Sequence, residues 1–320
     1  MPNCKPYVIG IDMGGTNTII GAVDARGKVV ASTAIKTHDY TEFEDFTDVL
    51  VKAIRRVMNE AGGQKMFAGI GIGAPNANYY SGNIENAANL PWKGVLPLGE
   101  VVSEALEIPV AVTNDANAAA IGEMTYGAAR GMRDFIMITL GTGLGSGIVI
   151  NGQLVYGSDG FAGELGHICV VRDGRQCGCG KKGCLETYCS ATGVVRTAVE
   201  MLQQRSDESL LRSINAEELT SKDVYDAAMK GDALAKDVFD YTGRIMGQAF
   251  ADFVSFSAPE AIVLFGGLSL AGDLLMNPIR EAMEANLLPY WKGKVKLKAS
   301  DLKSSEAAVL GAAALGWKAQ

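Results

Sequence analysis

Four residues with metal-binding side chains crowd into one short stretch of the second half of the chain. They are His167, Cys177, Cys179 and Cys184, and glycines between the cysteines permit the tight turns that would bring them together. Three thiolates and one imidazole make the closed ligand set of a structural zinc ion. Five of the six cysteines fall within residues 169–189, which in a reducing compartment favours a metal site over disulfides. We therefore predict Zn²⁺ at these four residues, with free thiols in the core as the alternative.

Two glycine turns, 14–16 and 141–147, each follow an apolar segment with the character of a buried strand. Such turns can present backbone N–H groups and a hydroxyl to phosphate, and a carboxylate beside one of them could hold Mg²⁺. A glycine pair directly after the apolar segment 261–265 could let a nucleotide base or ribose approach the backbone. The alternatives are ordinary hairpins and a plain strand-to-helix turn. The predicted nucleotide-binding residues are Asp12, Gly14, Gly15, Thr16, Thr142, Gly143, Gly266 and Gly267.

Carboxylates, amides and one imidazole stand at the ends of predicted strands and in loops. These groups suit a polyhydroxylated ligand, because each hydroxyl of such a ligand both donates and accepts hydrogen bonds. Asp115 follows an apolar strand and precedes a helix, so it could accept a hydroxyl proton during attack on phosphorus, or it could cap the helix. The set consists of Asn89, Asn114, Asp115, Glu164, His167 and Glu186.

The elements that must position these residues alternate between strands and helices, as in α/β proteins. A strand, a glycine turn and a strand occur twice, which suggests two related α/β lobes. Residues 76–99 have little periodicity and are predicted to be a long loop. The predicted strands are 7–12, 18–24, 28–35, 67–73, 108–113, 135–140, 148–150, 261–265 and 295–299. The predicted helices are 43–61, a segment from Asp115 to about Gly127, 192–204, 221–230, 233–256, 270–286 and 305–317.

Length and charge exclude several classes of protein. The 320 residues suffice for about two domains, and the net charge of −7 argues against a nucleic-acid surface. No apolar run reaches the ~20 residues of a transmembrane helix, and the N-terminus lacks the pattern of a signal peptide, so we expect a cytoplasmic protein without membrane contact. No P-loop sequence occurs. The G-x-G-x-x-G string at 178–183 is rejected as a dinucleotide motif because cysteines flank it and no predicted strand precedes it.

Taken together, the motifs at 12–16, 114–115, 164–167 and 177–186 resemble those of the ROK family (repressor, open reading frame, kinase), and the resemblance covers essentially the whole chain. It implies a two-lobed actin-like ATPase (ribonuclease H-like) α/β fold with an interdomain cleft and a zinc-binding segment. The implied smaller lobe comprises residues 1–118 and 303–320. The larger lobe, 119–302, carries the zinc site.

The resemblance also implies an activity, which is ATP-dependent phosphorylation of a hexose, with glucose at its 6-hydroxyl as the leading substrate. Asp115 matches the family's catalytic base, and the set of polar residues above matches its sugar contacts. His167 would bind zinc through one ring nitrogen and face the sugar with the other. Asn17 stands beside the first phosphate turn, where the family often has Lys. A homodimer is implied as well.

Several alternatives stay open at this point. The enzyme alternatives are an N-acetylmannosamine or N-acetylglucosamine kinase and a fructokinase. The others are a sugar-sensing repressor and a sugar-binding protein without turnover. A repressor of this family would carry an N-terminal helix-turn-helix, for which the first predicted strand, beginning near residue 6, leaves no room. The presence of Asp115 and both phosphate turns speaks against a protein without turnover.

Overall fold

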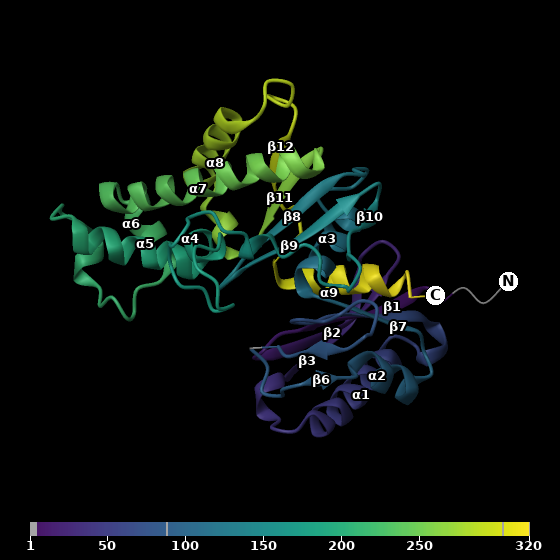
Figure 1. Ribbon diagram of the computed structural model, residues 1–320. Helices are drawn as coiled ribbons and strands as arrows, with labels where there is room; N and C mark the ends of the chain where they lie inside the picture. The colour runs from purple at the N-terminus through teal and green to yellow at the C-terminus, as the bar shows by residue number, and fades with distance from the viewer. Residues whose placement is uncertain (1–4, 88, 303, 320) are drawn as a thin grey trace. The chain divides into compact units, whose positions relative to one another are not determined.

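A computed structural model describes residues 5–87, 89–302 and 304–319, and the chain divides into two compact units (Figure 1). The first unit comprises residues 1–132, 153–163 and 301–320, and the second comprises 133–152 and 164–300. The boundary expected at residue 118 differs from this division, because it falls inside the continuous helix α3 (Asp115–Tyr126). Residues 153–163 also belong to the first unit, although no composition change marks them in the sequence.

The first unit is built on a five-stranded sheet with the strand order β3-β2-β1-β4-β7. β1 runs antiparallel to β2 and parallel to β4, and β4 runs parallel to β7. The strands predicted here are confirmed to within two residues at each end. Their bounds are β1 (Tyr7–Met13), β2 (Asn17–Asp24), β3 (Val29–Lys36), β4 (Phe67–Gly73) and β7 (Val110–Thr113).

Helices cover both faces of this sheet (Figure 1). The apolar side chains of β1 that pack with α1 (Phe43–Glu60) alternate with Gly10, which faces α9 (Ser304–Gly316). A Cβ on Gly10 or on its sheet partner Gly71 would clash with the backbone of α9, so these glycines allow the helix to lie directly on the sheet.

The long segment predicted to be a loop contains regular structure. Helix α2 (Leu98–Leu106) lies partly within the predicted loop, and its buried Leu98, Val102 and Leu106 recur every four residues. This helix was missed because Gly, Pro and Asn dominate the residues before it. Two short strands also pair there, β5 (Ile84–Glu85) and β6 (Val95–Leu96), and short 3₁₀ turns of this unit are η1 (Thr37–Asp39) and η2 (Gln64–Met66).

The sheet of the second unit contains β9, β8, β11 and β12 in that order. The predicted strand at 148–150 was too short, because the glycine-rich residues from Leu144 to Gly147 pair with β8 and only 141–143 form the turn. The strands are β8 (Phe135–Leu140), β9 (Leu144–Ile150), β11 (Ala261–Phe265) and β12 (Lys296–Ala299). The two-residue β10 (Gln153–Leu154) begins the segment 153–163 of the first unit.

The helices of the second unit surround one apolar core. They are α4 (Glu186–Cys189), α5 (Ala191–Gln204), α6 (Ser221–Met229), α7 (Ala233–Ser257) and α8 (Asp273–Asn286), with 3₁₀ turns η3 (Leu165–His167), η4 (Leu210–Ser213) and η5 (Gly267–Ala271).

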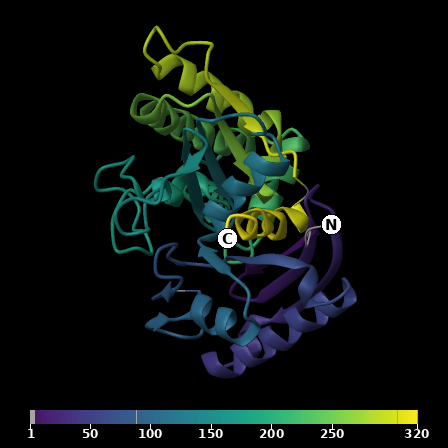
Figure 2. The same cartoon turned by 90° about the vertical axis from the view of Figure 1, so that its right-hand side faces the viewer.

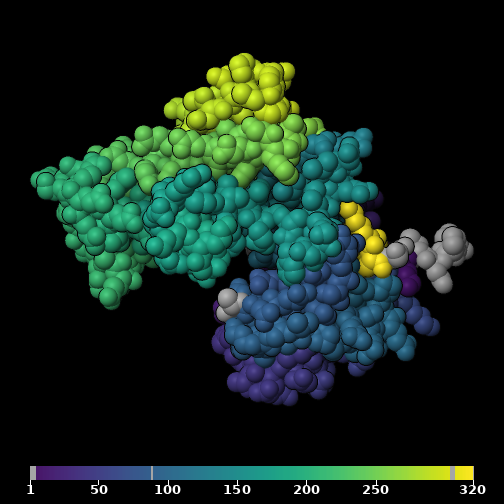
Figure 3. Space-filling view, viewed as in Figure 1, coloured from purple at the N-terminus to yellow at the C-terminus, as the bar shows by residue number. Residues whose placement is uncertain are grey.

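Helices α7 and α8 lie side by side (Figures 1 and 2), and Gly243 and Gly247 of α7 permit close contact with α8. α8 begins at Asp273 rather than at residue 270, because Gly272 has a φ of +57° and interrupts the helix. The segment that follows α8 stands out from the surface of the second unit (Figure 3). No helix in the described part of the chain has the length and apolar character needed to cross a membrane.

Candidate functional site

Two carboxylates of the first unit meet at the carboxyl ends of its parallel strands, where ligands bind in open α/β sheets. Asp12 is in register with Gly73, and Gly73 is in register with Thr113 of the next strand. Asp115 follows two residues later, as the first residue of α3. Gly73, between them in the sheet, has no side chain, and a Cβ there would lie 3.0 Å from that of Ala118 and 3.8 Å from Cα of Asp115, so α3 begins close against this strand.

The two carboxylates are electrostatically unfavourable neighbours. Desolvation raises the pKa of Asp12 to about 6, and the charge of Asp115 contributes to the rise. Desolvation also raises the pKa of Asp115, although the Ala116 N–H opposes the shift by donating to its Oδ1 at 2.8 Å. Neither carboxylate forms an ion pair with any residue that the structure describes. Neighbouring carboxylates with raised pKa values are typical of functional sites, and such a pair suits a divalent cation.

The cap of helix α3 is Asn114. Its Oδ1 accepts the N–H of Asn117 at 2.7 Å, and its backbone is extended, as expected of an N-cap residue. The alternative interpretation of Asp115 as the helix cap is therefore wrong. At the N-terminus of a helix, the Asp115 carboxylate is well placed to meet a ligand.

The first glycine turn lies against the loop that carries Asn89. The Gly14 N–H donates to the Asn17 carbonyl at 2.9 Å and closes the hairpin. A Cβ on Gly15 would clash with the carbonyl of Asn89, so the turn and this loop are in direct contact. Thr16 and Asn17 are exposed, and the N–H groups of Gly15 and Thr16 have no acceptor among the described residues. These two N–H groups remain available to an anion.

The predicted metal ligands converge in the second unit. The ligand atoms of His167, Cys177, Cys179 and Cys184 all lie within 4.8 Å of one another. Nδ1 of His167 is 3.6 Å from Sγ of Cys177, and the sulfurs of Cys179 and Cys184 are 3.7 Å apart. A tetrahedral zinc ion with Zn–S bonds of about 2.3 Å places its sulfurs about 3.8 Å apart. The donor set therefore fits zinc, and the predicted convergence is confirmed.

Glu186 connects this cysteine cluster to the second glycine turn. Its Oε1 lies 3.6 Å from Sγ of Cys177, and its Oε2 accepts the Leu144 N–H at 3.0 Å. A Cβ on Gly143 would clash with Oε2 of Glu186, which explains the glycine. Thr142 is exposed, and the N–H groups of Thr142 and Gly143 have no acceptor in the described part of the chain.

Glu164 directly precedes the short turn η3 and His167 is its last residue, and this turn packs on β9. The Leu165 N–H donates to Oγ of Ser146 at 3.0 Å, and a Cβ on Gly166 would clash with the Leu144 carbonyl. Because Nδ1 of His167 faces the cysteines, its Nε2 is the ring nitrogen left for another partner. The Lys181 ammonium donates to the His167 carbonyl at 2.7 Å and helps to fix this residue.

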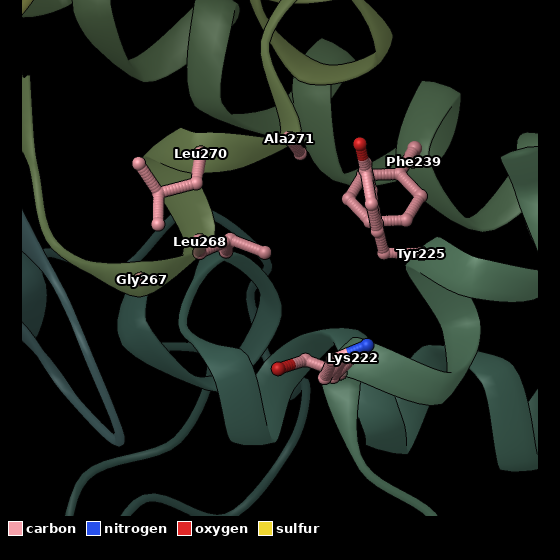
Figure 4. Close-up of a pocket in the computed structure, with 8 residues that line it drawn as sticks. Lys222, Tyr225, Phe239, Gly267, Leu268, Leu270 and Ala271 are labelled. Carbon is pink, nitrogen blue, oxygen red and sulfur yellow. The ribbon is translucent and has the colours of Figure 1, made fainter.

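A cavity of about 370 Å³ lies beside Gly267 (Figure 4). Leu268 and Leu270 line one side of it, and Tyr225 and Phe239 line the other. A second cavity, of about 420 Å³, is lined by Thr142, and the two share Ser221 as a lining residue. The second unit thus has two neighbouring cavities that share Ser221, one at the exposed turn of Thr142 and one, the apolar chamber, beside Gly267. Gly266, beside this chamber, has a φ of +105° and no room for a side chain against the Leu140 carbonyl.

The structure divides the predicted site residues between its two units. The first unit holds Asp12, Gly14, Gly15, Thr16, Asn17, Asn89, Asn114 and Asp115. The second unit holds Thr142, Gly143, Glu164, His167, Cys177, Cys179, Cys184, Glu186, Gly266 and Gly267. Sequence reasoning missed the side chains of the apolar chamber, since they come from α6, α7 and η5 and share no motif.

The model of the ROK family matches residues 8–319. The chain belongs to the ROK family. It is similar to the glucokinase of Halalkalibacterium halodurans, with 38% identity over 315 residues that cover 97% of this chain and 94% of that protein. It is also 30% identical to a xylose repressor of Caldicellulosiruptor bescii over 310 residues, which are 96% of this chain and 77% of the repressor.

Among solved structures, this ROK protein resembles a ROK family glucokinase from Streptomyces griseus, solved in complex with glucose and AMPPNP. The TM-score is 0.79 at 35% identity, and the match covers 98% of this chain and 99% of the other. The family and the two-sheet actin-like ATPase fold predicted from the sequence are therefore confirmed.

Proposed function

We propose that this ROK protein is a glucokinase that transfers the γ-phosphoryl group of ATP to the 6-hydroxyl of glucose. The observation that carries the proposal is the carboxylate of Asp115, which is neither a helix cap nor an ion-pair partner among the described residues. It stands where parallel strands end, beside a second carboxylate at Asp12. The full-length similarity to glucokinases supports the assignment of the reaction.

The nucleotide is assigned to the two cavities of the second unit that share Ser221. The exposed N–H groups of Thr142 and Gly143 would receive phosphate oxygens, and the apolar chamber beside Gly266 and Gly267 would receive the base. The family resemblance also assigns phosphate contacts to the turn formed by Gly14, Gly15 and Thr16, with Asn17 beside it. Mg²⁺, held through Asp12, would neutralise charge on the transferring phosphoryl group.

The sugar contacts are assigned, as the family resemblance implies, to six polar residues. In the first unit these are Asn89, Asn114 and Asp115, and in the second they are Glu164, His167 and Glu186. Zinc at the cysteine cluster would hold Nδ1 of His167 and so orient the ring, whose Nε2 meets a sugar hydroxyl. In this assignment the metal orients a ligand and takes no part in the reaction.

Asp115 acts as the general base. Its carboxylate accepts the proton of the attacking hydroxyl, whose oxygen forms a bond to the γ-phosphorus while the bond from that phosphorus to the β–γ bridging oxygen breaks. ADP leaves, and glucose 6-phosphate remains. Positioning and charge stabilisation supply most of the rate enhancement in reactions of this kind.

The test is ADP formation from Mg·ATP by the purified protein with each sugar of a panel and with no sugar. The panel contains glucose, mannose, fructose, N-acetylglucosamine and N-acetylmannosamine. We expect the highest kcat/KM with glucose. A preference for an N-acetylated sugar or for fructose would retain the kinase and replace its substrate. Absence of turnover with every sugar, in protein that holds zinc, would favour a sugar sensor.

We also propose that the protein forms a homodimer, as the family resemblance implies, and that it is cytoplasmic. Light scattering coupled to size exclusion would give a mass twice that of the chain if the dimer forms, and the mass of one chain if it does not.

A further inference from the structure

One guanidinium group of the second unit uses all of its N–H groups. Nε and Nη2 of Arg175 donate to the two carboxylate oxygens of Glu200, at 2.9 and 2.6 Å. Nη2 also donates to Oγ1 of Thr197 at 2.9 Å, and Nη1 donates to the carbonyls of Thr187 at 2.7 Å and Gly193 at 3.3 Å. The side chain is only 9% exposed, so the guanidinium is nearly buried and each of its N–H groups has an acceptor. We call this guanidinium with its five hydrogen bonds the Arg175 fork.

The backbone of Arg175 belongs to the loop that carries the cysteines. It lies two residues before Cys177, and its carbonyl accepts the N–H of Gly183, the neighbour of Cys184, at 2.8 Å. Its own N–H donates to Oη of Tyr188 at 3.0 Å, and its guanidinium lies 4.4 Å from the centre of the Tyr188 ring. Arg175 therefore lies in the segment that leads to Cys177 and is hydrogen-bonded to the segment that leads to Cys184.

The partners of the guanidinium all lie on α4 and α5. Thr187 and Tyr188 directly follow Glu186, the first residue of α4, and Glu200 and Thr197 lie on α5. The fork thus spans from the loop that positions the cysteine sulfurs to the helix that positions the Glu186 carboxylate. No other side chain among the described residues makes this connection with so many hydrogen bonds.

We infer that Arg175 is a positioning residue that fixes the cysteine cluster and Glu186 relative to one another. The part of this inference that concerns sugar affinity rests on the proposed function, because Glu186 is there a sugar contact. The part that concerns zinc retention does not. Lysine cannot replace Arg175, because a single ammonium has three donors and lacks the planar fork that fits the Glu200 carboxylate.

The experiment compares Arg175→Lys with wild type and with Arg212→Lys, in full-length protein loaded with zinc. Arg212 is a matched control, since it donates to the backbone carbonyls of Leu202, Arg205 and Asp207, away from the cysteine loop. Three quantities are measured: the rate of zinc transfer to an excess of a chelating metallochromic dye, the KM for glucose and the KM for ATP.

For Arg175→Lys we expect zinc loss to become about tenfold faster and the KM for glucose to rise about tenfold, while the KM for ATP stays within twofold of wild type. Arg212→Lys should match wild type in all three. Zinc loss and glucose KM at wild-type values in Arg175→Lys would overturn the inference.

A second variant covers the case in which Arg175→Lys does not fold. Glu200→Gln keeps the arginine and weakens its hydrogen bonds to residue 200. We expect its rate of zinc loss to lie between the rates of wild type and Arg175→Lys. Wild-type zinc retention in Glu200→Gln would contradict the inference. If the protein phosphorylates no sugar, the zinc measurement still decides the role of Arg175, so failure of the proposed function is distinguishable from failure of this inference.

Discussion

The backbone N–H of Leu144 donates a hydrogen bond of 3.0 Å to Oε2 of Glu186, whose other oxygen lies 3.6 Å from Sγ of Cys177. One carboxylate thereby contacts both the second glycine turn and the cysteine cluster. In the proposed kinase, the turn receives phosphate and Glu186 receives sugar. The relation between these two residues therefore sets the spacing between the two substrates on the second unit.

Gly143→Ala tests this spacing. A Cβ at residue 143 would clash with Oε2 of Glu186, so the turn or the carboxylate must move, and we expect kcat/KM for both substrates to fall by about 10- to 100-fold. Gly141→Ala is the matched control in the same turn, because its Cβ would meet no atom within 4 Å. Equal kinetics in the two variants would show that the contact between Gly143 and Glu186 does not position the substrates.

Asp12→Asn should stabilise the metal-free protein at neutral pH. Folding raises the pKa of Asp12 from 3.8 to about 6, so the folded state holds the proton more tightly than the unfolded chain does. Its contribution to stability is present below the unfolded pKa and is lost as the pH rises through the folded one. The variant avoids that loss, and we expect it to be more stable by about 1–3 kcal/mol above pH 6.

Urea unfolding of both proteins at pH 7.5 and near pH 4 measures this difference. The advantage of Asp12→Asn should shrink towards pH 4, while its kinase activity should be severely reduced at all pH values. Asp252→Asn, on the exposed surface of α7, controls for the loss of one negative charge. A variant less stable than wild type at pH 7.5 would mean that Asp12 is not electrostatically strained.

Removal of zinc should weaken sugar binding more than ATP binding. Cys177→Ser removes a ligand that is 3.6 Å from Nδ1 of His167, so the imidazole loses its fixed orientation. We expect loss of bound zinc, measured by mass spectrometry, and a rise of at least tenfold in the KM for glucose. Cys169→Ser is the control, because Cys169 is exposed and lies outside the ligand cluster. Full zinc content in Cys177→Ser would exclude the proposed ligand set.

Leu270→Glu tests the apolar chamber as the site of the base. Leu270 is 76% exposed yet lines the chamber beside Gly267, and a carboxylate there would remove apolar contact with the nucleotide and add repulsion. The KM for ATP should rise about five- to tenfold with the glucose KM unchanged. Leu288→Glu, at an exposed leucine outside the chamber, should alter neither. An unchanged ATP KM in Leu270→Glu would place the base elsewhere.

Much of the fold followed from local patterns in the sequence. The apolar strands on either side of the turn at Gly14 and Gly15 were predicted because strand and turn signals act over a few residues. The zinc ligands were predicted because all four lie within residues 167–184. The sequence could not exclude Asp115 as the cap of α3, since Asp caps helices well, and it did not identify Asn114 as the residue that does so. That choice depends on where β7 ends, which is set by its pairing with β4.

Features that depend on distant residues were not predictable. The chamber forms where Tyr225, Phe239 and Leu268 meet, and none of them stands in a recognisable motif. The same holds for Arg175, whose fork is recognisable only once α5 brings Glu200 beside the cysteine loop. The extent of β9 was missed because glycines at 145 and 147 resemble a turn until pairing with β8 is known.

The most direct test of the central claim is glucose-dependent ADP formation from Mg·ATP by wild type and Asp115→Asn, measured side by side. Asn is nearly isosteric and cannot accept the proton, so we expect kcat to fall by about 10²–10⁴-fold, with no fall in the melting temperature and little change in the KM for glucose. Turnover near that of wild type in Asp115→Asn would exclude Asp115 as the base. Absence of glucose-dependent ADP formation in the wild-type protein would contradict the glucokinase assignment itself.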